Sequence, residues 1–174
     1  MVVKSCSSIV FAIVLTLSAA TPALCQIIPP PAREIDLSGP RFGITALSTG
    51  IVDELKRQKG WALAPVVSQF GWQFEKQFYG KQGGPTAVTE GIVMFGGLEQ
   101  GVVIPSLSWL VGVRASDGTE IGVGPNITPA GVALALAAGK TFRAGVLNVP
   151  VNIAVVPSRL GMRVSLLTGF SLRR

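Results

Sequence analysis

The chain has 174 residues, of which 48% are hydrophobic and only 14% are charged, and it carries a net charge of +6 at pH 7. This length predicts one domain, but a mean hydropathy of +0.52 is high for a domain that meets only water. Because the sequence contains no histidine and only nine scattered acidic residues, it offers neither a Ser-His pair nor a metal-ligand pattern, and we expect no catalytic residue, cofactor or metal.

Residues 1–25 have the pattern of a signal peptide. Lys4 precedes an apolar run at 9–15, and small residues follow at 18–23, which predicts cleavage near 23–25. A retained membrane anchor is the alternative, but it needs about 20 apolar residues, more than this run provides. Cys6 lies inside the signal and Cys25 at the processing site, so no disulfide is expected in the mature chain. Lipidation of Cys25 is a second possibility, which the preceding Leu24 disfavours.

Residues 26–40 contain consecutive prolines at 29–31. Proline has no backbone N–H and favours an extended chain, so this segment is predicted to be a leader outside the sheet. A proline-rich ligand for a partner domain is the alternative. The folded domain is therefore expected to cover 41–174.

From residue 41 the chain consists of short runs separated by Gly, Pro, Asn and Asp, which is typical of successive antiparallel strands. The expected strands are about 41–48, 66–79, 87–99, 103–116, 119–128, 132–143, 147–158 and 162–173. One helix is expected at 51–59, with acidic residues in its first turn, basic residues in its last and Gly60 as its stop. A βαβ unit is disfavoured because no further helix separates the later strands.

Side chains alternate along several of these strands, most clearly where Phe70, Trp72 and Phe74 interleave with Gly71, Gln73 and Glu75. The second face is rich in small residues, at 71, 112, 122, 124, 133, 135, 137, 139 and 169. A soluble barrel would cover its outer face with well-solvated side chains. The pattern instead predicts large apolar residues facing lipid, with small and polar residues in a narrow interior.

In architecture, residues 43–174 resemble the small outer-membrane β-barrels of Gram-negative bacteria. The segments 70–75 (FGWQFE) and 122–127 (GVGPNI) also look like those of uncharacterised exported barrel proteins. The resemblance implies an all-β, eight-stranded antiparallel up-and-down barrel in the cell outer membrane. Its partners would then be outer-membrane lipid and the envelope insertion machinery. Such barrels usually end in an aromatic residue, whereas here Phe170 is followed by SLRR.

Alternation assigns four charged side chains to the inner face: Glu75, Arg114, Glu120 and Arg163, with Arg143 joining them if its strand keeps register. Because a buried charge needs a partner, we expect a salt network across the lumen. The alternative is an ion or proton pathway.

These features predict a small outer-membrane barrel with a structural or surface-interaction role and no catalysis. The alternative is a soluble periplasmic or secreted lipocalin-like barrel that binds a small apolar ligand. The basic residues are too dispersed for nucleic-acid binding, and Lys56, Arg57, Lys59 and the terminal arginines are better suited to lipid head groups.

Overall fold

The computed structural model describes residues 37–80 and 84–172. The predicted signal peptide, Cys25, the proline run and the terminal arginines lie outside this part. The described strands are β1 (Gly39–Leu47), β2 (Val66–Gly80), β3 (Thr86–Gly96), β4 (Ile104–Arg114), β5 (Thr119–Thr128), β6 (Gly131–Ala144), β7 (Leu147–Ser158), β8 (Gly161–Gly169) and the short β9 (Ser171–Leu172).

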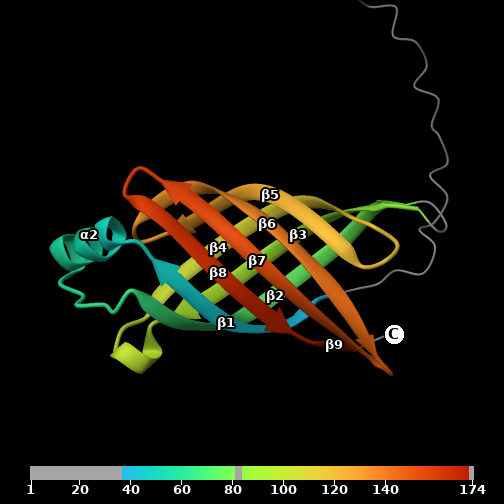
Figure 1. Ribbon diagram of the computed structural model, residues 1–174, viewed down its shortest axis with the longest axis horizontal. Helices are drawn as coiled ribbons and strands as arrows, with labels where there is room; N and C mark the ends of the chain where they lie inside the picture. The colour runs from blue at the N-terminus through green and yellow to red at the C-terminus, as the bar shows by residue number, and fades with distance from the viewer. Residues whose placement is uncertain (1–36, 81–83, 173–174) are drawn as a thin grey trace, which may run out of the picture.

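The strands form a closed barrel (Figure 1). Each of β1 to β8 pairs antiparallel with its sequence neighbours, and pairing of β1 with β8 closes the ring, while β9 adds a short pairing to β7. The eight-stranded antiparallel up-and-down barrel predicted from the sequence is therefore confirmed. Closure leaves the barrel wall without an open strand edge.

The two ends of the barrel differ. The helix α2 (Thr49–Lys59) and the 3-10 turn η1 (Leu98–Gln100) lie at one end, and the start of β1 and the end of β8 meet at the other (Figure 1). We call these the helix end and the terminal end. Within residues 37–80 and 84–172, no helix has the length and apolarity needed to cross a membrane.

Several predicted boundaries were wrong by a few residues. The barrel begins at Gly39 inside the predicted leader, since Pro40 sits near the strand start, where its missing N–H is tolerated. The strand expected to reach residue 99 ends at Gly96, because Gly97 takes a φ of +81° and turns the chain into η1. The helix begins at Thr49, so its first turn holds no acidic residue, although its last turn is basic as predicted.

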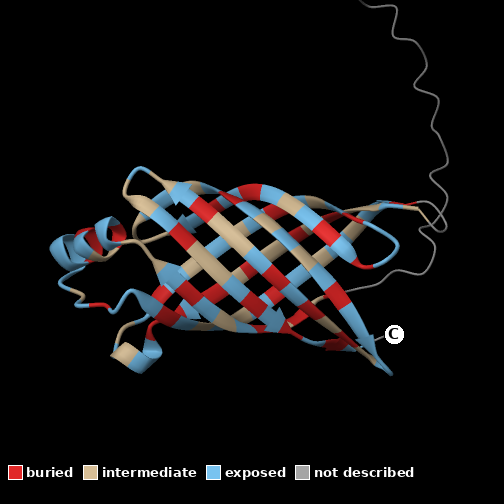
Figure 2. Ribbon diagram, viewed as in Figure 1, coloured by how far each residue is buried: buried red, intermediate tan, exposed pale blue. Residues whose placement is uncertain are grey.

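The predicted alternation is visible along the strands as exposed and buried residues in turn (Figure 2). Phe74 and Trp109 are 58% and 64% exposed, whereas Gln73 is 1% exposed. The large apolar face of β2, β4 and β5 therefore points outward, and the small and polar face points into the lumen, as expected.

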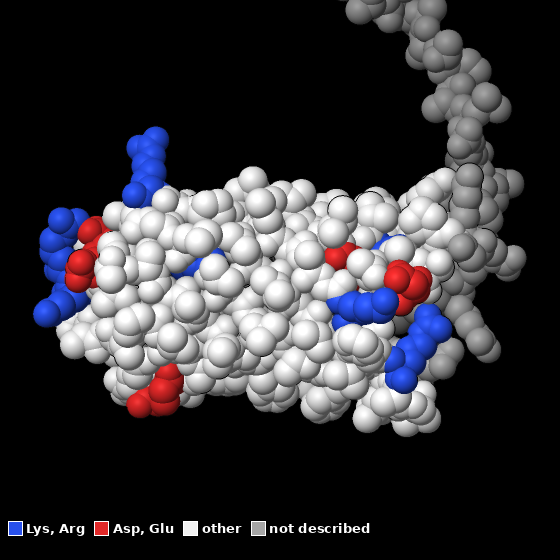
Figure 3. Space-filling model, viewed as in Figure 1, with Lys and Arg blue, Asp and Glu red and all other residues white. Residues whose placement is uncertain are grey.

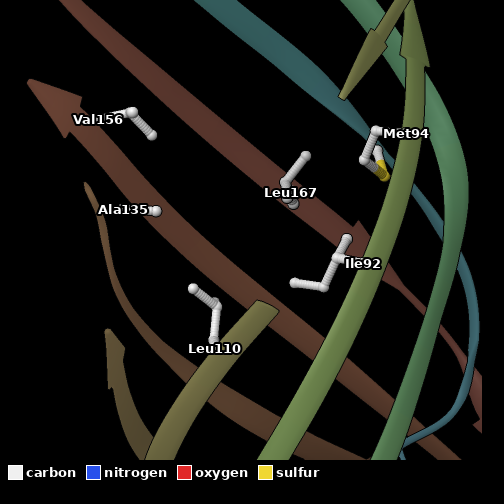
Figure 4. Close-up of a cluster of buried hydrophobic side chains, with 6 residues drawn as sticks. All are labelled: Ile92, Met94, Leu110, Ala135, Val156 and Leu167. Atoms are coloured by element: carbon white, nitrogen blue, oxygen red, sulfur yellow. The ribbon is translucent and has the colours of Figure 1, made fainter. Parts of the chain in front are cut away.

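The interior is less polar than predicted. Buried large apolar side chains from four strands meet in the lumen (Figure 4): Ile92, Met94, Leu110, Val156 and Leu167. Ala133, Ala135 and Ala137 of β6 pack against them and leave the space that the larger side chains occupy. The interior of an eight-stranded barrel has to be filled, and small residues on one wall allow large ones on the other.

The helix covers the lumen at its end of the barrel. Ile51 and Leu55 of α2 are buried against Leu63, Val67 and Ile104. The helix stops at Gly60, whose φ of +71° is left-handed and whose N–H donates to the Lys56 carbonyl. Packing of one apolar helix face thus closes much of this mouth.

Candidate functional site in the lumen

A cluster of charged side chains fills the lumen near the terminal end. Glu75, Glu90, Arg114 and Glu120 come from the consecutive strands β2, β3, β4 and β5. The register places Glu75 opposite Glu90 and Arg114 opposite Glu120. Every one of these side chains is at most 8% exposed.

Arg114 holds the cluster together, but its three partners are not equivalent. Its Nη1 and Nη2 donate to both carboxylate oxygens of Glu75 at 2.6 and 2.5 Å. Its Nε and Nη2 lie 2.8 and 2.7 Å from Oε2 of Glu120. The nearest oxygen of Glu90 is 3.7 Å from Nη2. Glu90 is therefore the weakly compensated member of the group.

A second guanidinium lies on the adjoining wall. Arg41 of β1 donates from Nε to Oε1 of Gln73 at 2.9 Å and from Nη2 to the Leu37 carbonyl at 2.6 Å. It is close enough to Glu90 and Glu75 for electrostatic attraction. Counted by formal charge, the buried group of three glutamates and two arginines has one more acidic than basic side chain.

The carboxylates also meet one geometric condition for a metal site, because one oxygen from each of Glu75, Glu90 and Glu120 lies within 4.8 Å of the others. Arg114, however, forms ion pairs with all three. A guanidinium already in contact with every carboxylate would repel a metal cation, so this geometry fits an internal salt network.

The predicted lumen residues divide into two groups. Glu75, Arg114 and Glu120 are brought together, whereas Arg163 lies near the helix end, where its Nη1 donates to Thr128 Oγ1. Arg143 is exposed near the end of β6 and does not join the cluster.

Sequence reasoning missed Glu90 and Arg41. Arg41 had a usable signal, because it alternates with the exposed Phe42 and Ile44. Glu90 had none, because the inward Ile92 and Met94 of its strand are as apolar as its outward neighbours.

A cavity of about 80 Å³ lies in the lumen between the charge cluster and α2. Its wall combines the apolar residues of both buried clusters with polar groups. Asn126 Nδ2 donates to the hydroxyl oxygens of Ser106 and Ser108, at 2.9 and 2.8 Å. Arg163 also lines this space.

Comparison of the chain with family models, with curated proteins and with solved structures finds no match.

Proposed function

We propose that this chain is a small outer-membrane β-barrel with a structural or surface-interaction role and no catalysis. The observation that carries the proposal is the outer surface, where large apolar side chains are exposed on all eight main strands, among them Phe42, Trp72, Phe95, Trp109, Ile121, Leu134, Ile153 and Leu166. An exposed apolar surface of this extent is typical of contact with a membrane or with another protein.

The exposed charged residues of the described strands lie near one end of the barrel, so the middle of the outer wall is uncharged. Among the described strands, the exposed charged residues are Lys76, Lys140 and Arg143, each within four residues of the terminal end of its strand. In Figure 3 most acidic and basic groups lie toward the two ends, and apart from one small basic patch left of the centre the surface between them is uncharged. In β2 the outward positions from Val66 to Phe74 carry no charge, and such a stretch spans about 20 Å along the barrel axis at the tilt usual for barrel strands. This height is close to that of the apolar band of outer-membrane barrels, which is about 25 Å.

Polar atoms on this band have partners within the protein. The indole Nε1 of the exposed Trp109 donates to Thr89 Oγ1 at 2.9 Å, and that hydroxyl in turn donates to the Leu110 carbonyl at 3.3 Å. In hydrocarbon no water would be present to satisfy these groups. The arrangement therefore suits a lipid-facing surface.

The proposed orientation puts the terminal end in the periplasm and the helix end outside. The longest connection, which contains α2, and the loop that contains η1 both lie at the helix end. Outer-membrane barrels have short periplasmic turns and longer external loops. The exposed face of α2, with Lys56, Arg57 and Lys59, would then be available to head groups or to a partner.

The alternative is a soluble lipocalin-like carrier of a small apolar ligand, and the cavity beneath α2 is the observation in its favour. A carrier would have its large aromatic side chains around the ligand and a polar exterior. Here Phe70, Trp72 and Phe74 are on the outside, which favours the membrane proposal.

Fractionation of a Gram-negative host that expresses the full chain tests the proposal. We expect recovery in the outer-membrane fraction, extraction only with detergent, and migration in gels that changes on heating. Recovery from the periplasm as a monomer without detergent would contradict the membrane proposal and favour the carrier.

A further inference from the structure

Arg163 is a buried cation without a carboxylate partner in the part of the chain that the structure describes. It enters the lumen from β8 near the helix end and is 8% exposed. Its Nη1 donates to Thr128 Oγ1, and its Nε is fully buried with no acceptor among the described residues. Within residues 37–80 and 84–172, no acidic group lies within ion-pair distance of it.

The other buried arginines of the described chain show what such a charge normally requires. Arg114 contacts three carboxylates, and Arg41 has one amide and two carbonyl acceptors besides nearby acids. Removing a guanidinium from water costs several kcal/mol unless charges and hydrogen bonds compensate it. Arg163 has only one hydroxyl acceptor, that of Thr128, so the described residues supply no counter-charge at this position.

The cavity beside Arg163 is rich in donors. Ser106 and Ser108 both accept from Asn126, which leaves the hydrogen of each hydroxyl available to donate into the same space. The single carboxylate on the cavity wall, Glu90, belongs to the Arg114 cluster at the other end of the lumen. The electrostatic field near Arg163 therefore favours an anion.

Cavity size limits the ligand. One water needs about 10–15 Å³ measured in the same way, so 80 Å³ holds several waters or one small anion with water. A long-chain fatty acid or a nucleotide is too large. The two separated oxygens of a carboxylate suit a guanidinium nitrogen and a serine hydroxyl on the same cavity wall better than a spherical ion does.

We propose that the lumen binds a small carboxylate anion, of the size of formate or acetate, with one oxygen on Nη2 of Arg163 and the other within reach of the serine hydroxyls. The apolar wall next to this site accommodates the carbon end of the ligand. The proposal concerns the interior alone and holds whether the outer surface meets lipid or water.

The test uses the full chain, labelled with ¹⁵N and refolded in a non-ionic detergent. The Nε–Hε signal of Arg163 is followed while sodium acetate replaces sodium gluconate at constant ionic strength, with sodium chloride as a parallel titration. We expect a saturable shift with acetate, with half-saturation at roughly millimolar concentration for so small a ligand. Arg159→Met, which removes an exposed charge at the same end of the barrel, should leave this shift unchanged.

Two results would overturn the proposal. An Arg163 signal that does not saturate means that water alone fills the cavity, and an equal or stronger response to chloride means that the site does not select carboxylates. Thermal unfolding provides the second readout: acetate should raise the melting temperature of the wild type and of Arg159→Met by a few degrees, but not that of Arg163→Met. If Arg163→Met does not fold, the wild-type titration decides alone.

Discussion

Glu75 and Glu90 face each other across β2 and β3, an arrangement that is unfavourable for two carboxylates unless a cation lies between them. Arg114 supplies that cation, but it contacts Glu75 through two hydrogen bonds and approaches Glu90 only to 3.7 Å. The contributions of the two glutamates to stability should therefore differ in sign.

Removing the cation should be the most damaging change in the cluster. Arg114→Met leaves three buried carboxylates, and we expect it to lower the free energy of unfolding by about 3–5 kcal/mol. Glu90→Gln removes the least compensated charge and should leave stability unchanged or raise it. Urea unfolding of detergent-refolded protein measures both. A loss in Glu90→Gln as large as that in Arg114→Met would show that Glu90 is a necessary partner.

Asp117 provides a pH-dependent test outside the barrel strands. Hydrogen bonds from the Thr119 N–H and hydroxyl, together with Lys140, lower the pKa of this exposed carboxyl from 3.8 to about 2. The depressed pKa means that the turn is stabilised above about pH 4 and loses this contribution as the pH falls toward 2. NMR titration of the Asp117 carboxyl should give a midpoint near 2, and a midpoint near 3.8 would mean that these contacts do not form in solution.

Among the elements, the β4–β5 pairing has an interruption. The register omits two pairs, Trp109 opposite Pro125 and Leu110 opposite Gly124. Pro125 has no N–H to donate. A side chain at Gly124 would meet the Trp109 carbonyl oxygen, so this position needs glycine for the close approach of the two strands.

This contact predicts different effects for two strand glycines. Gly124→Ala should destabilise the barrel by about 1–3 kcal/mol, because backbone atoms of β4 block the new methyl group. Gly91→Ala is the matched control, since a methyl group there meets nothing within 4 Å. The urea concentration at the unfolding midpoint is measured for both variants. Equal shifts would contradict the close approach of β4 and β5 at Gly124.

Sequence reasoning succeeded where the two faces of a strand differ in chemistry. β5 and β7 begin and end as predicted, and the outward aromatic residues of β2 were assigned to the correct face. It failed where both faces are apolar, so Glu90 of β3 could be found only from its register opposite Glu75. Arg163 was assigned to the lumen correctly, but alternation gives no position along the barrel axis and could not separate it from the charge cluster.

At the scale of the whole molecule, the proposed orientation exposes α2 to the medium. Protease added to intact cells should cut within residues 56–59, where exposed basic residues end the helix, and should spare the turn near Asp117. Mass spectrometry of the fragments identifies the sites. Cleavage near α2 only after the outer membrane has been opened would reverse the orientation.

The central claim, that lipid covers the barrel wall, is tested most directly by tryptophan quenching. The chain has three tryptophans: Trp72 and Trp109 are 46% and 64% exposed on the wall, and Trp61 lies in the loop after α2. The full chain is refolded into phosphatidylcholine vesicles with and without bromine on the acyl chains. We expect bromine to quench the emission of the wild type and of Trp61→Phe strongly, and that of a Trp72→Phe, Trp109→Phe double variant weakly. Equal emission in both kinds of vesicle, with the protein remaining in the aqueous phase, would contradict the claim.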